Sequence, residues 1–285
     1  MTLRALAAEA EAALRSGPHP ERARRDVESL LLHLLAQNRA WLLANWDAAA
    51  SAETQAALRG LIARRCSGEP IQYITGVAEF FALPFSVSPQ VLIPRPETEH
   101  LVEDVLRLAA QFASPSIRIA DIGTGSGAIA IALAHSLPYA QIFATDLSPE
   151  ALSVAQQNAA QNRVADRISF LEGDLLAPLA GQTFSIIASN PPYVPLRDRD
   201  SLAVEVREFE PHSALFSGED GLATYRRLIP AARELLAPGG WLVMEIGFGQ
   251  EPAIRESLLA GGFIDVRFVP DYQGIPRVAA GRNYK

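Results

Sequence analysis

The sequence has a single cysteine and no long apolar run. Because Cys66 is the only cysteine among 285 residues, the chain cannot form an internal disulfide, which favours a reducing compartment. The N-terminal residues include Glu9 and Glu11 and lack the apolar core of a signal peptide. No stretch approaches the roughly 18 uninterrupted apolar residues of a membrane span. We therefore expect a cytoplasmic protein that has no membrane partner.

The chain also lacks an excess of positive charge. It carries 25 Lys and Arg against 32 Asp and Glu, for a formal net charge of -7. Such a chain has no overall positive field to attract nucleic acid phosphates. Its five histidines are scattered without the spacing of metal ligands. We expect neither direct nucleic acid binding nor a metal site.

The composition and length indicate a folded chain of two domains. Hydrophobic residues make up 49% and charged residues 20%, which is enough apolar material for packed cores. Apolar positions at helical spacing predict a small helical bundle over residues 1–76, with about four short helices. Breaks at Gly17, Asn38 and Asp47 divide it, and Ser51 is a candidate N-cap. Alternation over residues 79–93 predicts a β-hairpin in a linker of residues 77–95.

Residues 96–285 have the pattern of an α/β domain. A helix is expected after Pro96, and from residue 117 onward strand-like and helix-like segments alternate. Such alternation predicts right-handed crossovers and a mostly parallel, doubly wound, Rossmann-like sheet. The expected strands are 118–122, 141–145, 168–171, 184–188, 241–246, 263–269 and 277–281, and the expected later helices are 128–137, 149–161 and 222–236. The last two strands have no helix between them, so we expect an antiparallel pair at one edge.

A glycine-rich loop follows the first expected strand of this domain. It begins at Asp121 and Ile122 and continues through Gly123, Thr124, Gly125, Ser126 and Gly127 into a helix. Glycines let the backbone approach a ligand closely, and the helix N-terminus offers unpaired N–H groups. The loop therefore predicts a nucleotide-like cofactor. Its spacing also satisfies the dinucleotide-binding pattern, so the cofactor stays open at this point.

Acidic residues follow the next two expected strands. Asp146 is placed where its carboxylate can accept both hydroxyls of a ribose, which suits NAD and S-adenosylmethionine equally. Asp174 is placed for the exocyclic amino group of an adenine, and Leu175 can pack on the ring face. Together with the glycine loop, these residues predict a site for an adenosine cofactor.

The segment after the fourth expected strand carries the most specific chemistry. Asn190, Pro191, Pro192 and Tyr193 follow in direct succession. Prolines donate no backbone hydrogen bond and hold the chain extended, so the Pro191 carbonyl and the Asn190 side-chain oxygen can face one cleft. Two fixed acceptors can bind the two N–H bonds of a planar amide and favour the more positive nitrogen of a transition state. Tyr193 can offer an aromatic face to the flat group.

These residues resemble the release-factor glutamine methyltransferases, the PrmC or HemK family. The resemblance covers nearly the whole chain and includes two further segments, residues 70–76 (Pro-Ile-Gln-Tyr-Ile-Thr-Gly) and 92–99 (Leu-Ile-Pro-Arg-Pro-Glu-Thr-Glu). It implies S-adenosylmethionine as cofactor and S-adenosylhomocysteine as product. By this analogy Gly123 to Gly127 line the methionine part, Asp146 holds the ribose, and Asp174 with Leu175 lies by the adenine. Asn190 to Tyr193 would receive the substrate, and Asn190 would also touch the cofactor.

The resemblance further implies a protein substrate. It predicts methyl transfer to the side-chain amide nitrogen of the glutamine in the Gly-Gly-Gln motif of class I peptide chain release factors, in translation termination. The helical domain would recognise the release factor, and we expect the enzyme to be a monomer. The alternatives are a ribosomal-protein glutamine methyltransferase, a DNA adenine amino methyltransferase, a nicotinamide oxidoreductase and a catalytically silent binding module. The acidic balance and the lack of a base-reading domain speak against DNA.

Overall fold

The computed structural model describes residues 1–114 and 116–284, which form two compact units. The first unit contains Met1–Val77 together with Leu202–Phe209, and the second contains Ala78–Ser201 and the chain from Glu210 onward. The domains expected from the sequence differ in two respects, the first being that the expected linker of residues 77–95 falls within the second unit apart from Val77. They assign residues 202–209 to the methyltransferase domain, whereas these residues group with the helical unit.

The first unit is a bundle of helices around one apolar core. Leu6, Leu30 and Leu58 are almost fully buried at its centre. Ser51 caps the fourth helix, because its hydroxyl accepts a hydrogen bond from the Thr54 N–H at 3.0 Å, as predicted. The helices are α1 (Leu3–Leu14), α2 (Ala23–Leu35), α3 (Arg39–Ala44), α4 (Ala52–Cys66), α5 (Ile71–Thr75) and α9 (Val204–Phe209), with a short 3-10 turn at Pro20–Arg22. The sequence predicted about four helices, so α5 and α9 are additions.

Buried ion pairs hold α9 in the first unit. The Arg65 guanidinium on α4 is 2% exposed and donates to Asp26 Oδ2 at 2.7 Å and to Glu205 Oε2 at 2.8 Å. Arg22 also donates to Glu205, at 3.0 Å. A buried guanidinium needs such partners, since desolvation otherwise makes its charge costly. The Glu205 carboxylate therefore anchors α9 to the other helices of the first unit.

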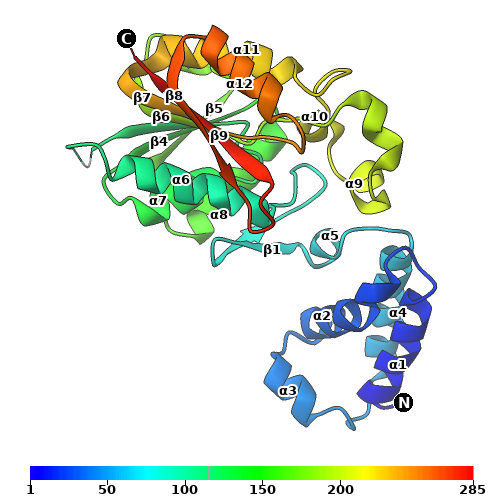
Figure 1. Ribbon diagram of the computed structural model, residues 1–285. Coiled ribbons are helices and arrows are strands. Elements are labelled where there is room, and N and C mark those ends of the chain that lie inside the picture. The colour runs from blue at the N-terminus through cyan, green and yellow to red at the C-terminus, as the bar shows by residue number, and fades with distance from the viewer. Residues whose placement is uncertain (115, 285) are drawn as a thin grey trace. The chain divides into compact units, whose positions relative to one another are not determined.

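The second unit is a seven-stranded sheet with helices on both faces (Figure 1). The strand order is β5-β4-β3-β6-β7-β9-β8, parallel as far as β7, with β9 antiparallel to both neighbours. The strands are β3 (Arg118–Ile122), β4 (Gln141–Asp146), β5 (Ile168–Glu172), β6 (Phe184–Ser189), β7 (Leu236–Glu245), β8 (Phe263–Pro270) and β9 (Pro276–Asn283). The predicted doubly wound sheet and its antiparallel edge pair are confirmed.

Helices cover the sheet in two layers (Figure 1). On one face lie α6 (Glu99–Ala109), α7 (Ala128–Ser136) and α8 (Pro149–Gln161), and on the other lie α11 (Ala223–Leu235) and α12 (Glu251–Ala260). Shorter elements are α10 (His212–Leu215) and 3-10 turns at Pro96–Thr98, Ala165–Arg167, Ala177–Leu179 and Leu196–Ser201. With both faces covered, the central strands are apolar throughout, as Ile119 and Ile187 illustrate by being fully buried. The sequence did not predict α12.

A two-stranded hairpin precedes the sheet. Its strands are β1 (Val77–Phe80) and β2 (Leu83–Ser86), so it ends earlier than the predicted range of 79–93. The buried side chain of Asn158 on α8 accepts from the Ser86 N–H and donates to the carbonyls of Ser86 and Ser126. This single amide joins the hairpin to the end of the glycine loop.

The fold brings the candidate residues to one edge of the sheet. Strands β3, β4, β6 and β7 are parallel, so their carboxyl ends lie side by side, and ligands of such sheets bind beyond these ends. None of the helices within residues 1–114 and 116–284 has both the length and the apolar character needed to cross a membrane.

Candidate active site

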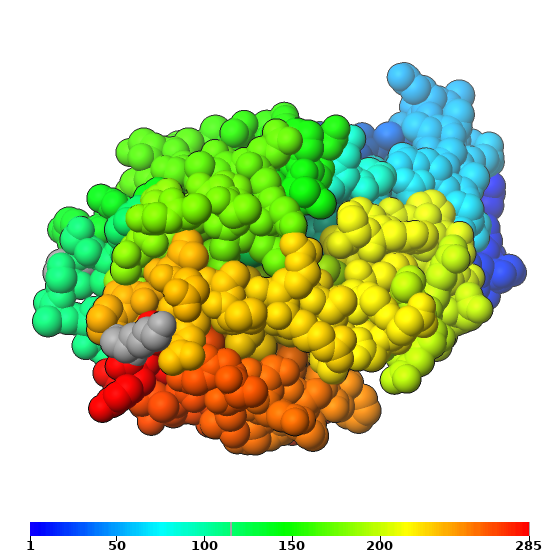
Figure 2. Space-filling view, turned by 90° about the horizontal axis from the view of Figure 1, so that it is seen from above, coloured from blue at the N-terminus to red at the C-terminus, as the bar shows by residue number. Residues whose placement is uncertain are grey.

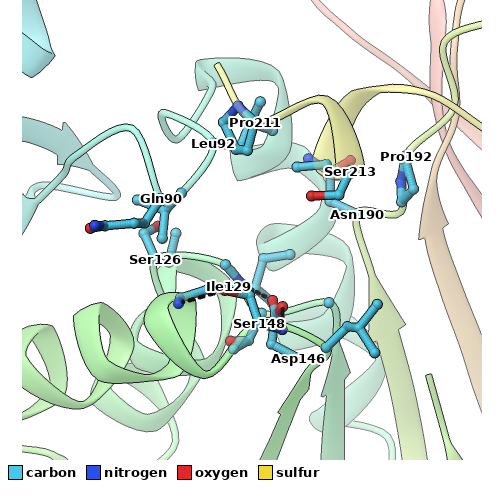
Figure 3. A pocket seen from close by; sticks show the side chains of 18 of the residues that line it. Gln90, Leu92, Ser126, Ile129, Asp146, Ser148, Asn190, Pro192, Pro211 and Ser213 are labelled. Carbon is cyan, nitrogen blue, oxygen red and sulfur yellow. Dashed lines mark hydrogen bonds between the residues drawn. The ribbon is translucent and has the colours of Figure 1, made fainter. Parts of the chain in front are cut away.

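A pocket of about 550 Å³ opens beyond the carboxyl ends of the parallel strands. Its volume falls in the usual range for small-molecule sites. In Figure 2 its mouth is a hollow bordered by green atoms, from the chain after β4 and β5, and yellow atoms, from the chain before α11. Of the residues predicted from sequence, those that line it are Gly123, Thr124, Gly125, Ser126, Asp146, Asp174, Leu175, Asn190 and Pro192. In Figure 3, Asp146 and Ser126 lie on one side and Asn190 and Pro192 on another.

The glycine loop leaves its part of the pocket open. Gly123 and Gly125 have φ angles of 72° and 55°, and no atom lies within 4 Å of a Cβ built on either residue. Glycine meets this backbone requirement without strain and leaves room for a ligand against the chain. Gly127 differs, since it does not line the pocket and its Cβ would lie 2.9 Å from Ile131 Cδ1. It serves helix packing.

Asp146 ends β4 and holds the adjacent glycine loop by a direct hydrogen bond. Its Oδ2 accepts from the Gly125 N–H at 2.8 Å, and its Oδ1 accepts from the Ser148 N–H at 2.9 Å. Ser148 caps α8 by accepting from the Ala151 N–H. Each carboxylate oxygen has a further lone pair, so Asp146 can still accept hydroxyl donors from a ligand.

Asp121 lies buried behind the loop. Its Oδ2 accepts from the Thr124 hydroxyl at 2.7 Å and from the Ala130 N–H at 3.2 Å. Burial raises the pKa of its carboxyl to about 7, against the lowering effect of these hydrogen bonds. Asp121 therefore shapes the loop from inside the protein, although it does not line the pocket.

Asp174 and Leu175 line the pocket at the end of β5. The Asp174 carboxylate is half-exposed and forms an ion pair with Arg227 of α11, which lines the pocket too. The pair leaves acceptor positions on the carboxylate unused. The Thr145 hydroxyl donates to the Leu175 carbonyl at 2.9 Å, which fixes this turn against β4.

The loop after β6 places only part of its predicted residues in the pocket. Asn190 and Pro192 line it, whereas Pro191 and Tyr193 do not. The Tyr193 hydroxyl instead donates to Glu245 Oε1 at 3.2 Å, and burial raises the pKa of this phenol above its usual value. The expected aromatic face of Tyr193 thus stays a prediction, while Phe216, which the sequence reasoning missed, lines the pocket.

Two further polar side chains support this loop, and the sequence reasoning missed both. Thr98 Oγ1 accepts from Asn190 Nδ2 at 3.1 Å and donates to Glu245 Oε2 at 2.6 Å. Glu245 is 2% exposed, and burial raises the pKa of its carboxyl to about 6. Available signals were the position of Thr98 in the segment 92–99 and the single acid in the apolar run 241–246.

The Tyr193 end of the loop is held by close backbone packing. Gln250 Nε2 donates to the Tyr193 carbonyl at 2.9 Å. A Cβ at Gly221 would lie 2.3 Å from that carbonyl oxygen, and one at Gly247 would lie 3.0 Å from Tyr193 Cδ2. These glycines are needed for contact rather than for turn geometry alone. The loop is therefore a rigid wall of the pocket.

Family models match both parts of the chain. The PrmC N-terminal domain model matches residues 5–76, and the methyltransferase small domain model matches residues 102–207. A release factor glutamine methyltransferase from Geobacter sulfurreducens is 47% identical over 92% of this chain and 90% of its own length. Another from Escherichia coli is 42% identical over 93% of this chain and 94% of its own length.

Solved structures support the fold of the second unit. A methyltransferase from Pyrococcus furiosus aligns with a TM-score of 0.52 at 18% identity, over 72% of this chain and 91% of its own. The hMettl16 catalytic domain, solved in complex with an RNA hairpin of the MAT2A 3'UTR, aligns with a TM-score of 0.58 at 20% identity, over 72% and 77%. At these identities the likeness concerns the fold alone.

Proposed function

Because the chain belongs to the release factor glutamine methyltransferase family, we propose that it methylates the side-chain amide nitrogen of a release factor glutamine. The glutamine would be that of the Gly-Gly-Gln motif of class I peptide chain release factors, and the methyl donor would be S-adenosylmethionine. One observation carries the proposal: the open glycine loop, Asp146 and Asn190 line a single pocket at the carboxyl edge of the sheet.

The pocket residues fit S-adenosylmethionine. The open space beside Gly123 and Gly125 can take the methionine part, and the free lone pairs of Asp146 can accept the ribose hydroxyls. Asp174 and Leu175 are suited to the adenine, with Arg227 orienting the carboxylate. When bound, this cofactor supplies an electrophilic methyl on a sulfonium and leaves as S-adenosylhomocysteine.

The chain's own contribution is to hold the nitrogen and to shape its charge. Asn190 Oδ1, on the pocket wall, would accept one N–H bond of the glutamine amide, and the carbonyl of the neighbouring Pro191, a residue that does not itself line the pocket, is the proposed second acceptor. The nitrogen held in this way would take up the methyl group through its lone pair and then lose a proton to solvent. Fixed acceptors stabilise the positive nitrogen that develops on the way, and orientation can contribute up to about 7–11 kcal/mol.

We assign recognition of the release factor to the helical domain of residues 1–76, which the PrmC N-terminal domain model matches. Such contacts away from the glutamine would supply binding energy that orients it. We place the reaction in the cytoplasm, where a factor of translation would be met. That the enzyme acts as a monomer and without direct nucleic acid contact remains a prediction.

The test is methylation of three candidate substrates by the purified protein. Labelled S-adenosylmethionine is supplied with a class I release factor, with ribosomal proteins or with adenine-containing DNA. We expect label on the release factor alone, and mass spectrometry should place it on the Gly-Gly-Gln glutamine. Label on ribosomal protein or DNA with none on the release factor would replace the proposal with one of those activities.

A further inference from the structure

A buried carboxylate that does not line the pocket is linked to Asn190 by a chain of hydrogen bonds. Glu245, the last residue of β7, accepts from the Thr98 hydroxyl and from the Tyr193 hydroxyl. Thr98 in turn accepts from Asn190 Nδ2. All of these residues lie in the second unit. A path of polar atoms therefore runs from the carboxyl end of β7 to the pocket wall.

Charged and polar groups from the turn before α6, from α11 and from β9 lie near Glu245. Glu97, from the turn before α6, raises the pKa of Glu245, and Arg277 of β9 lowers it. Tyr225 of α11 donates its hydroxyl to the Glu245 main-chain carbonyl at 2.7 Å. The Glu245 carboxylate accepts from two side-chain donors, Thr98 and Tyr193, and the residue is 2% exposed.

The donor and acceptor roles along this path are fixed by elimination. An ionised carboxylate only accepts hydrogen bonds, so the single hydroxyl proton of Thr98 must point at Glu245. The Thr98 oxygen then has only lone pairs to offer to Asn190. The Asn190 side chain must therefore turn its NH2 toward Thr98, which leaves its carbonyl oxygen on the other side.

Resting on the proposed function, we propose that Glu245 and Thr98 are positioning residues that set the amide orientation of Asn190, so that its oxygen faces the substrate nitrogen. A flipped Asn190 would present two donors to the two donors of a glutamine NH2 and could not bind it. The ionised Glu245 carboxylate thus selects one of the two orientations of the Asn190 amide, which have nearly the same shape. Specificity for a planar NH2 group depends on this selection.

Three variants test the relay by its effect on turnover. Thr98→Val keeps the shape but removes the hydroxyl, Glu245→Gln keeps the shape but can donate to Thr98, and Thr98→Ser keeps the hydroxyl. We expect kcat to fall about tenfold or more in Thr98→Val and Glu245→Gln, the rate equivalent of ~1.4 kcal/mol. S-adenosylmethionine affinity should change less than about twofold, and Thr98→Ser should restore most of the rate.

A double-mutant cycle shows whether Thr98 acts through Asn190. In an Asn190→Ala background, Thr98→Val should change kcat no further, because no amide remains to orient. The same fold loss in both backgrounds would overturn the relay. Thr75→Val is the matched control, since the Thr75 hydroxyl donates to the Ile71 carbonyl within α5 and Thr75 does not line the pocket.

A second readout does not depend on any substrate. The Asn190 side-chain NH2 signals in an NMR spectrum, assigned by their loss in Asn190→Ala, report the hydrogen bond to Thr98. We expect them to shift in Thr98→Val and Glu245→Gln and to keep their position in Thr98→Ser and Thr75→Val. Unshifted signals in Thr98→Val would overturn the relay even if release factor methylation succeeds. Shifted signals with no methylation would support the relay and count against the proposed function alone.

Discussion

Two buried carboxyl groups, those of Asp121 and Glu245, lie behind the pocket wall rather than in it. Burial raises the pKa of Asp121 to about 7 and that of Glu245 to about 6. Each accepts hydrogen bonds from a residue that does line the pocket, Thr124 or Thr98. These two carboxyl groups therefore hold pocket-lining residues in place without contacting a ligand themselves.

The Glu245 carboxyl predicts an acidic limb in the rate profile. Below about pH 6 Glu245 gains a proton, can donate to Thr98, and no longer fixes the Asn190 amide. We expect kcat at saturating cofactor to fall as the pH is lowered through about 6. Steady-state rates between about pH 5 and 8 check this, and a kcat that stays flat across that interval would show that the ionised form is not required.

Asp121→Asn predicts a pH-dependent gain in stability. The folded protein keeps a proton on Asp121 up to about pH 7, whereas the unfolded chain releases it near 3.8. The wild type therefore loses stability as pH rises between these values, and the neutral variant does not. We expect the variant's advantage in urea unfolding to grow by roughly 1–4 kcal/mol from pH 5 to 8, since one pKa unit is ~1.4 kcal/mol. An advantage independent of pH would contradict the buried charge.

Asp146 and Asn190 should separate binding from turnover. Asp146→Ala should weaken S-adenosylmethionine binding by more than ~1.4 kcal/mol, a tenfold effect, because it removes the ribose acceptor. Asn190→Ala should leave that affinity nearly unchanged while lowering kcat. Calorimetry and initial rates measure the two quantities. Unaltered affinity in Asp146→Ala would exclude it from the cofactor site, and equal losses of affinity in both variants would remove the substrate role of Asn190.

Much of the site could be predicted from residue types next to strand ends. Gly123, Asp146 and Asn190 each follow a strand of recognisable pattern, and the pocket contains all three. Thr98 and Glu245 could not be assigned a role in this way. They matter only through a contact between residues 147 positions apart, which depends on the packing of the finished sheet.

At the scale of elements, the sequence pattern predicted those helices and strands whose bounds depend on residues within the segment itself. Strand β3 and helix α8 were expected at their observed bounds, because alternation, Pro149 in the first turn and the Ser148 cap all lie within the segment. Residues 202–209 fall inside the expected range 96–285 of the methyltransferase domain but group with the helical unit. Their place depends on the pairing of Glu205 with Arg65, which no local pattern contains.

Removing the Asn158 side chain on α8 should destabilise the second unit alone. The fully buried Asn158 amide makes three hydrogen bonds that join β2 to the glycine loop, and each contributes about 0.5–1.5 kcal/mol net. Asn158→Ala should therefore lower the free energy of unfolding by about 2–4 kcal/mol in urea. Asn162→Ala is the control on the adjacent turn, where the amide is partly exposed and the loss should stay near ~1 kcal/mol. Equal losses in the two variants would refute a special role for Asn158.

Removing the Arg65 side chain should likewise destabilise the first unit. Arg65→Ala leaves the carboxylates of Asp26 and Glu205 without their buried partner, so the unit should lose about 3–5 kcal/mol. Arg59→Ala on the same helix breaks only an exposed pair with Glu9, which solvent screens, so the loss of stability should be much smaller. Fluorescence of Trp41 and Trp46 follows unfolding of this unit. A loss in Arg65→Ala no larger than the control would show that the buried pairs contribute little.

At the scale of the whole molecule, the chain combines a helical unit with a methyltransferase sheet. Its family membership rests on relatives that are 47% and 42% identical over 92% and 93% of the chain, and so on both parts. The sheet unit alone contains every residue that lines the pocket, so the chemistry belongs to it. We propose that the helical unit recognises the protein substrate.

The central claim is that hydrogen-bond acceptors on the loop of residues 190–193 bind the glutamine nitrogen and orient it toward the methyl donor. The most direct measurement is a crystal structure with S-adenosylhomocysteine and a Gly-Gly-Gln peptide. We predict that the glutamine amide nitrogen lies about 2.7–3.2 Å from both Asn190 Oδ1 and the Pro191 carbonyl oxygen, on the side of the cofactor sulfur. A glutamine bound elsewhere, or an Asn190 NH2 turned toward it, would contradict the account.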